Sequence, residues 1–277
     1  MLRRRRRGPK PAASAREVAT PAIVPAEPRT RRRSRQDVPV PPQLRIPDAP
    51  VAPSRTKQHA SSAPLVLVTG FEPFGGEPSN PSWDICTLLP ATIAGARIET
   101  LEVPCEFRRA IEVVAHAIDR SRPSLVICIG QAGGRSQLSV ERVGINIDDA
   151  REPDNAGSQP VDEPVAPMGP PAYFATVPVK AMAKAARDAG IPAEVSNTAG
   201  TYVCNHLLYG VLHYIAASGL ATRAGFIHVP YAEGQVVDKP GAPSMAIPTM
   251  ARGVEAAIAA ALEIAIDAQV SEGRIAM

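Results

Sequence analysis

Short apolar runs alternate with longer segments of helical periodicity along most of the chain. Apolar runs bounded by glycine, proline or polar residues predict strands at Leu65–Thr69, Arg97–Val103, Leu125–Ile129, Ala193–Ser196 and Gly225–Val229. Apolar positions that recur every three or four residues predict helices that begin at Asn80-Pro81 and Val203, and that cover Phe107–Ile118, Val177–Ala189 and Ile247–Ile266. This alternation predicts the α/β class, here a three-layer α/β/α sandwich around a mostly parallel, or mixed, central sheet.

A further predicted strand, Leu138–Ile147, carries a carboxylate on an apolar face. From Glu141 onward its residues alternate, so Glu141 shares one face with three apolar residues. A buried carboxylate needs a partner, which here is either a buried arginine or backbone N–H groups, or a catalytic histidine. The strand leads into the long loop Asp148–Tyr173, and loops of this length are usually functional or disordered.

The first 63 residues differ in composition from the rest. They contain no Phe, Trp or Tyr, and residues 1–60 hold 11 of the 30 prolines. Residues 1–60 also hold 15 of the 30 Lys and Arg but 4 of the 27 Asp and Glu, which leaves the other 217 residues with a net charge of −8. Such a segment cannot bury enough apolar surface to offset its ordering entropy. We therefore expect residues 1–63 to be a disordered basic extension and residues 64–277 to be the folded domain.

Two interpretations of this extension stay open. The clusters Arg3–Arg7 and Arg31–Arg35 would suit an arm that binds nucleic acid or an anionic surface. A passive extension, including one from translation that starts upstream of the natural start, is favoured because no aromatic residues interleave with the arginines for base stacking. Nucleic acid is expected as a partner only through this extension.

The cysteines bear on compartment and chemistry. They are spread through the chain without C-x-x-C spacing, at Cys86, Cys105, Cys128 and Cys204. This pattern argues against a disulfide scaffold or a metal site, and it favours a reducing, cytoplasmic location. No run is long and apolar enough to span a bilayer, so no membrane association is expected.

Cys204 stands at the predicted start of a helix. Ser196, Asn197 and Thr198 are cap-type residues just upstream, and apolar residues recur every fourth position from Val203. N–H groups at a helix start are unpaired and the dipole there favours negative charge, so the thiol is expected to lose its proton easily and act as a nucleophile. The alternative is that Cys204 is a small buried apolar residue.

A base for this nucleophile is found by elimination among five histidines. One lies in the extension, one is in the middle of a helix, and two face away from Cys204 on its own helix: His59, His116, His206 and His213. His228 remains, at the end of a predicted strand, where α/β folds assemble their sites. With Glu141, Cys204 and His228 make a candidate catalytic triad drawn from three elements.

Two glycine-rich loops supply candidate binding residues. Gly70–Asn80 contains Phe71 and Phe74, which either fold back onto the core or form an apolar wall for a small flat ligand. Gly130–Arg135 follows a buried strand, and Gln131 could offer both a donor and an acceptor there. Neither loop has the spacing of a phosphate-binding motif.

Five stretches of this chain resemble the pyroglutamyl peptidase I family, also called pyrrolidone-carboxylate peptidase. They are T-G-F-E-P-F-G-G-E (Thr69–Glu77), G-Q-A-G-G-R (Gly130–Arg135), E-R-V-G-I-N (Glu141–Asn146), S-N-T-A-G-T-Y-V-C-N (Ser196–Asn205) and H-V-P-Y (His228–Tyr231). The resemblance covers about residues 64 to 270. It implies a cytosolic cysteine peptidase that removes N-terminal pyroglutamate from peptides, with an α/β/α fold, no cofactor and homo-oligomeric assembly as a dimer or tetramer.

The resemblance also assigns residues. It matches the family nucleophile to Cys204, the histidine to His228 and the glutamate to Glu141. It places Phe71, Phe74 and Gln131 in the pocket for the lactam ring. Among the departures from the family pattern, Glu152 stands where an apolar residue is usual, which puts the substrate preference of the pocket in doubt. Two other functions stay open: a cysteine hydrolase for another small cyclic or N-acyl amide, and a nucleic-acid-binding protein that uses the arginine-rich arm.

Overall fold

The computed structural model describes residues 63–272. The predicted extension, residues 1–63, lies outside this range except for Ala63 and stays a prediction. The central sheet contains seven strands in the order β2-β3-β1-β4-β9-β5-β8. Their bounds are β1 Leu65–Phe71, β2 Thr92–Ile93, β3 Ala96–Val103, β4 Leu125–Gln131, β5 Leu138–Glu141, β8 Ala193–Ser196 and β9 Arg223–Val229.

The sheet is mixed. β3, β1, β4 and β9 are parallel neighbours. β5 pairs antiparallel with β9 and parallel with β8, so these two strands run against the other four. The short edge strand β2, which the sequence pattern did not predict, pairs antiparallel with β3. The prediction of a mostly parallel sheet within an α/β fold is therefore confirmed.

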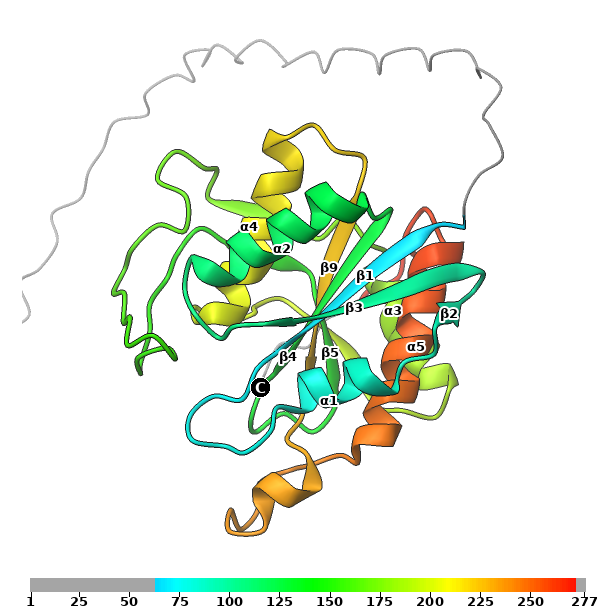
Figure 1. The fold of residues 1–277 in the computed structure, drawn as a ribbon. Coiled ribbons are helices and arrows are strands. Elements are labelled where there is room, and N and C mark those ends of the chain that lie inside the picture. The colour runs from blue at the N-terminus through cyan, green and yellow to red at the C-terminus, as the bar shows by residue number, and fades with distance from the viewer. Residues whose placement is uncertain (1–62, 273–277) are drawn as a thin grey trace, which may run out of the picture. The chain divides into compact units, whose positions relative to one another are not determined.

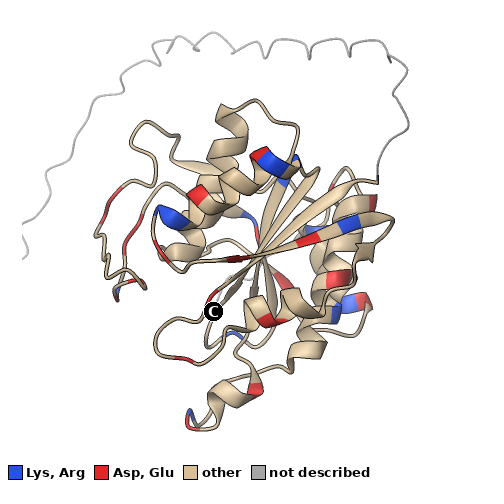
Figure 2. Ribbon diagram, viewed as in Figure 1, with Lys and Arg blue, Asp and Glu red and all other residues tan. Residues whose placement is uncertain are grey.

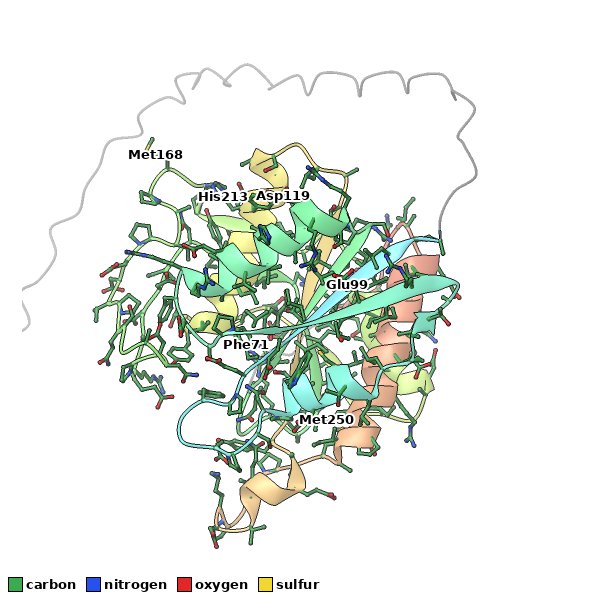
Figure 3. The ribbon with its side chains drawn as sticks, in the orientation of Figure 1. Phe71, Glu99, Asp119, Met168, His213 and Met250 are labelled. Atoms are coloured by element: carbon green, nitrogen blue, oxygen red, sulfur yellow. The ribbon has the colours of Figure 1, made fainter. Side chains whose placement is uncertain are left out.

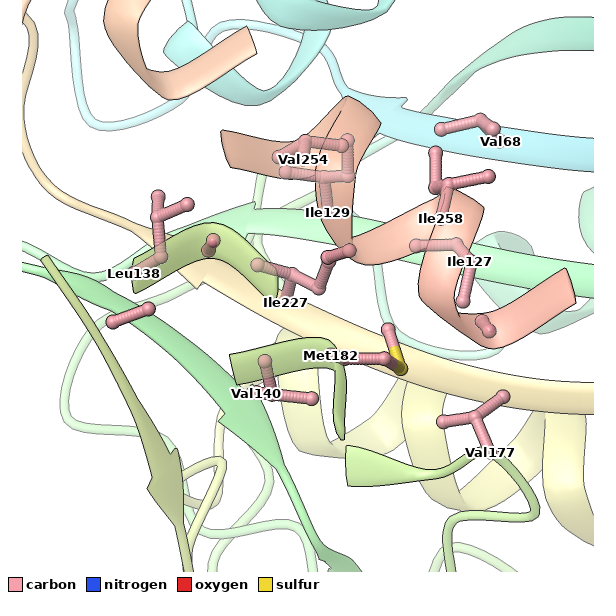
Figure 4. Packing of buried hydrophobic residues seen from close by; sticks show 14 of the residues in the cluster. Val68, Ile127, Ile129, Leu138, Val140, Val177, Met182, Ile227, Val254 and Ile258 are labelled. Atoms are coloured by element: carbon pink, nitrogen blue, oxygen red, sulfur yellow. The ribbon is translucent and has the colours of Figure 1, made fainter. Parts of the chain in front are cut away.

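Helices cover both faces of the sheet (Figure 1). One apolar cluster lies between the sheet and the first set of helices, which are α1 Pro81–Leu88, α3 Val179–Asp188 and α5 Ile247–Glu263. Figure 4 shows part of this cluster, in which Ile127 and Ile227 of the sheet lie among Met182, Val254 and Ile258 of the helices. A second cluster lies under α2 Arg109–Ser121 and α4 Val203–Ala217. Helices on two faces complete the predicted three layers.

The predicted strand Leu138–Ile147 is wrong in its extent. Its second half forms β6, Val143–Ile145, which leaves the central sheet and pairs with β7, Ala172–Phe174. The cause is a side chain of α4: Asn205 accepts a hydrogen bond from the N–H of Ile145 at 2.9 Å and donates to the carbonyl oxygens of Ile145 and Ile147. An amide can pair with backbone as another strand does, so this edge is satisfied by a helix.

The last helix ends earlier than predicted, at Glu263 instead of Ile266. The segment that follows crosses to α3, where the carboxylate of Asp267 accepts hydrogen bonds from the N–H groups of Lys180 and Ala181. These are first-turn N–H groups of α3, which have no intrahelical partners, so Asp267 serves as the cap that the helix lacks locally.

The described residues also show how charge is distributed and whether any helix could cross a membrane. Figure 2 shows that positions of both charge signs are spread along the helices and loops. Among residues 63–272, no helix combines the length and apolar character that crossing a bilayer requires.

Candidate active site

Cys204 is the second residue of α4, as predicted, and is partly buried. Its Sγ packs against the end of β4, where a Cβ added to Gly130 would lie 2.9 Å from the sulfur. Gly130 in turn pairs with His228 on β9. The nucleophile and the proposed base therefore lie at neighbouring strand ends on the α4 face of the sheet.

The acidity expected for this thiol is not found. Burial and the negative charge of Glu141 raise the pKa of the Cys204 thiol to about 12, against a smaller lowering by Arg135. A helix N-terminus is worth about 0.3–1 kcal/mol, and one pKa unit corresponds to about 1.4 kcal/mol. The helix start therefore cannot offset the burial, and the resting group is a neutral thiol that needs a base.

His228 is placed to be that base. Its ring is buried, and Nδ1 lies 2.8 Å from Oε1 of Glu141. A carboxylate only accepts hydrogen bonds, so Nδ1 carries the proton and Nε2 of the neutral ring is the acceptor. Burial lowers the pKa of His228, and the bond to Glu141 offsets this only in part. The ring is therefore neutral at pH 7 and able to take a proton.

Glu141 has both of the partners that the sequence left as alternatives. Its side chain is fully buried at the end of β5, and Oε1 accepts from His228 and from Nη1 of Arg135 at 2.6 Å. Burial would raise the pKa of Glu141, but the hydrogen bond from His228, the positive charge of this ring when it is protonated, and the charge of Arg135 hold that pKa below its usual range. Glu141 is therefore ionised while buried.

Arg135 is the residue of this site that the sequence analysis missed. It follows the glycine-rich loop after β4, and its side chain is 26% exposed. The position of Arg135 at the end of a glycine-rich loop beside the site could have indicated a functional role. Its pairing with Glu141 could not be predicted, because it depends on how that loop folds back.

The expected pocket residues divide between the two faces of the sheet. Phe71 packs on the same face as Cys204, with its ring centroid 6.5 Å from that of Phe226, and Figure 3 labels it at the end of β1. Phe74 is half-exposed and lies 6.4 Å from the ring of Tyr202.

Gln131 lies on the other face, because side chains alternate along a strand and the preceding residue faces Cys204. Its Oε1 accepts a hydrogen bond from Nε2 of Gln235 at 2.9 Å. The oxygen end of this amide is thus engaged within the protein. A role for Gln131 in binding stays a prediction.

Backbone N–H groups near Cys204 are candidate donors to the oxyanion that would form in an attack by its sulfur. The N–H of Ala132 donates to the carbonyl oxygen of Val229 at 2.8 Å as part of the sheet, so it is not available. The N–H of Cys204 belongs to the first turn of α4, whose N–H groups have no intrahelical acceptor. The N–H of Cys204 is therefore a candidate oxyanion donor on the nucleophile itself.

Three of the other histidines lie where the elimination placed them, and His59 lies outside the described residues. His116 is exposed on α2, and His213 stacks on Tyr209 and bonds the hydroxyl of Tyr173 (Figure 3 labels His213). His206 is buried away from the site: Nδ1 lies 2.8 Å from Asp148, and Nε2 accepts the N–H of Arg108 at 2.7 Å. His206 therefore fastens α4 to two loops.

In residues 63–272, no group of three or more His, Cys, Asp or Glu side chains is arranged to hold an ion. The three other cysteines, Cys86, Cys105 and Cys128, are buried, and burial raises the thiol pKa of each.

The chain is similar to proteins of one known family. The model of the pyroglutamyl peptidase family matches residues 65–264. Pyrrolidone-carboxylate peptidases from Escherichia fergusonii and Yersinia pestis are 53% and 50% identical over 209 and 211 residues, which is 75% and 76% of this chain and 97% and 98% of theirs.

Two solved peptidase structures resemble this chain over nearly all of their own length. Pyroglutamyl peptidase I from Bacillus amyloliquefaciens is 41% identical, with a TM-score of 0.73 over 76% of this chain and 100% of that one. A mutant pyrrolidone carboxyl peptidase from Pyrococcus furiosus is 43% identical, with a TM-score of 0.69 over 72% of this chain and 98% of that one. The chain therefore belongs to the pyroglutamyl peptidase family.

Proposed function

We propose that Cys204, His228 and Glu141 form the catalytic triad of this protein. As a member of its family, the protein is a cysteine peptidase that removes N-terminal pyroglutamate from peptides. The observation that carries the triad is the 2.8 Å hydrogen bond between Nδ1 of His228 and Glu141, with the Cys204 sulfur packed at the adjoining strand end. A nucleophile, a base and an orienting carboxylate are the parts that acyl transfer requires.

The reaction begins from a neutral thiol and a neutral imidazole. Nε2 of His228 removes the proton of Cys204 as the sulfur attacks the carbonyl carbon that joins pyroglutamate to the next residue. The N–H of Cys204 stabilises the oxyanion that forms. His228 then gives its proton to the leaving amine, and the same ring activates water to hydrolyse the thioester. Glu141 stabilises the imidazolium in both halves of the reaction.

The lactam ring is proposed to bind beside Phe71 and Phe74. Phe74 is half-exposed, whereas Phe71 is 2% exposed, so Phe74 offers more surface to a ligand. Gln131 is proposed to contribute to binding of the lactam ring from its position at the end of β4, next to Gly130. A pocket that pairs the lactam N–H and C=O rejects proline, which lacks the ring carbonyl.

Residues 64–277 are proposed to form the catalytic unit, since the family match spans residues 65–264. We propose that the protein works in the cytoplasm on peptides that begin with pyroglutamate, and that it assembles as a homo-oligomer, because the family resemblance implies both. The basic extension is proposed to be passive, and nucleic acid a partner only through it.

Release of a fluorophore from a pyroglutamyl amide tests the proposed function. We expect turnover that is lost after alkylation and in Cys204→Ala and Cys204→Ser. Alanine variants of the three buried cysteines, Cys86, Cys105 and Cys128, should keep their kcat per folded molecule. Loss of kcat in one of those three would misplace the nucleophile. A panel that includes prolyl and N-acetyl amides would reveal a hydrolase for another amide.

A further inference from the structure

Arg135 joins two parts of the active site with one side chain. Its Nη1 donates to Oε1 of Glu141 at 2.6 Å, and its Nη2 donates to the carbonyl oxygen of Thr198 at 3.0 Å. Glu141 ends β5, whereas Thr198 belongs to the loop that leads from β8 to Cys204. The guanidinium therefore links the carboxylate of the triad to the segment that carries the nucleophile.

The Thr198 loop has mostly local support. Thr198 exchanges hydrogen bonds with the hydroxyl of Ser196, and its own hydroxyl accepts the N–H of Gly200. A bond from Thr201 to the carbonyl oxygen of Asp149 anchors the far end of the loop. Local turns fix the shape of a loop but not its position against the rest of the site. Ala199 packs into the core and holds the middle of the loop, and the contact with Arg135 ties the loop to Glu141.

Arg135 also balances the charge of the site. Glu141 is fully buried, and a buried carboxylate stays ionised only when a positive group compensates it. In the resting state the ring of His228 is neutral, so the compensating charge is that of Arg135. The same positive charge lowers the pKa of both His228 and Cys204.

We infer that Arg135 is a positioning residue of this active site, which keeps Glu141 ionised and holds the loop before Cys204 in place. The inference rests on the proposed triad. A planar guanidinium presents two N–H donors in a fixed fork, so one side chain can reach a carboxylate and a carbonyl oxygen at once. A lysine in this place keeps the charge but cannot reproduce the fork.

The test compares Arg135→Met and Arg135→Lys with the unmodified full-length chain. The pH dependence of kcat and KM is measured with the pyroglutamyl fluorophore substrate, on samples titrated for reactive thiol. The rate at which iodoacetamide alkylates Cys204 is measured over the same pH range. The charged and titratable groups around the base are Glu141 from β5, Arg135 from its loop, and the thiols of Cys204 and Cys128, which stay protonated.

Arg187→Met is the matched control. Arg187 forks in the same way, from Nη1 to the carbonyl oxygen of Ala193 at 3.0 Å and from Nη2 to Glu272, but it lies on α3 beneath the opposite face of the sheet. We expect this variant to lose stability and to keep the kcat and pH profile of the unmodified enzyme.

For Arg135→Met we expect kcat to fall by about one to two orders of magnitude with a smaller change in KM. The acid limb of kcat/KM should move to higher pH, because without the positive charge the pKa values of His228 and Glu141 rise. Alkylation of Cys204 should become slower at each pH. Arg135→Lys should lose kcat but leave the acid limb close to that of the unmodified enzyme.

The outcomes separate two failures. An unmodified protein that releases no fluorophore overturns the proposed function, while the alkylation rates still report on Arg135. An Arg135→Met variant with unmoved alkylation and pH profiles, or with full kcat per titrated site, overturns the role of Arg135. If Arg135→Met does not fold, an Arg135→Lys variant with unchanged kcat gives the same refutation.

Discussion

Replacement of Glu141 by glutamine isolates the charge of the triad carboxylate from its shape. Both of its partners donate to the same oxygen, Oε1, so the oxygen of a glutamine amide can accept from His228 and from Arg135 together. The amide nitrogen then takes the place of Oε2. The variant therefore keeps the geometry and loses the negative charge.

The loss can be estimated from the distance between the charges. Nδ1 of His228 and Oε1 of Glu141 are 2.8 Å apart. Unit charges about 4 Å apart at an effective dielectric constant of about 20 attract by about 4 kcal/mol. Each 1.4 kcal/mol corresponds to about a tenfold change in rate, so full loss of imidazolium stabilisation corresponds to about three orders of magnitude at a separation of about 4 Å, and to more at the shorter distance seen here. We expect kcat to fall by about two orders of magnitude or more.

KM should change little in Glu141→Gln, because a fully buried side chain does not touch the peptide. The stability cost should be about 1–3 kcal/mol, because the amide N–H₂ takes the buried place of Oε2, which has no hydrogen-bond partner among the described residues. Each kcal/mol corresponds to a fall in Tm of about 2–4 °C for a domain of this size. A purely structural Glu141 would instead lose stability and keep a near-normal kcat.

The assay measures Tm and thiol-titrated kcat on the same sample. Titration removes the contribution of unfolded molecules, so a lower kcat reports on catalysis alone. Full activity per titrated site in Glu141→Gln would refute the electrostatic role of Glu141 and leave a Cys204–His228 dyad.

Two further variants test the surroundings of the triad. His206→Ala leaves the buried carboxylate of Asp148 without its hydrogen-bond partner on His206, so the free energy of unfolding should fall by about 1.5–3 kcal/mol, with little change in titrated kcat. Denaturant unfolding measures the loss of stability, and a large loss of kcat would contradict the structural role of His206. Gly130→Ala places a Cβ 2.9 Å from the Cys204 sulfur and 2.7 Å from the ring of Phe226, so the nucleophile must shift and kcat should fall about tenfold or more, at a packing cost of about 1–3 kcal/mol. Gly234→Ala, where no atom lies within 4 Å, is the control, and equal kcat in the two glycine variants would refute the argument.

The strands and the candidate triad could be predicted because both have local signals. Buried strands appear as apolar runs that end in glycine or proline, and the apolar repeat from Val203 places Cys204 in the first turn of its helix. The cap-type residues upstream were a wrong signal, because the N-cap of α4 is Tyr202 and no side chain caps this helix. The elimination that led to His228 used only helix geometry and strand ends. Each of these inferences depends on residues that are near one another in sequence.

The features that were missed depend on contacts between distant residues. Asn205 ends the central strand at Glu141 by pairing with β6, and nothing in the alternating pattern of that segment indicates a helix side chain. The pKa of Cys204 follows from burial beneath other elements, which outweighs the helix start. Arg135 reaches Glu141 through a loop whose course the sequence does not fix.

Strand direction explains why the site needs Arg135. β4 and β9 are parallel, so Gly130 and His228 lie at one edge of the sheet, where open α/β sheets place their sites. β5 runs the other way, and its last residue, Glu141, is level with Phe226. Glu141 is thus a diagonal neighbour of His228, one step inside the sheet. A strand parallel to β9 would end at the solvent edge, where water could stabilise a carboxylate. The reversed direction of β5 buries the carboxylate of Glu141. Because His228 is neutral in the resting state, this buried charge needs the positive charge of Arg135.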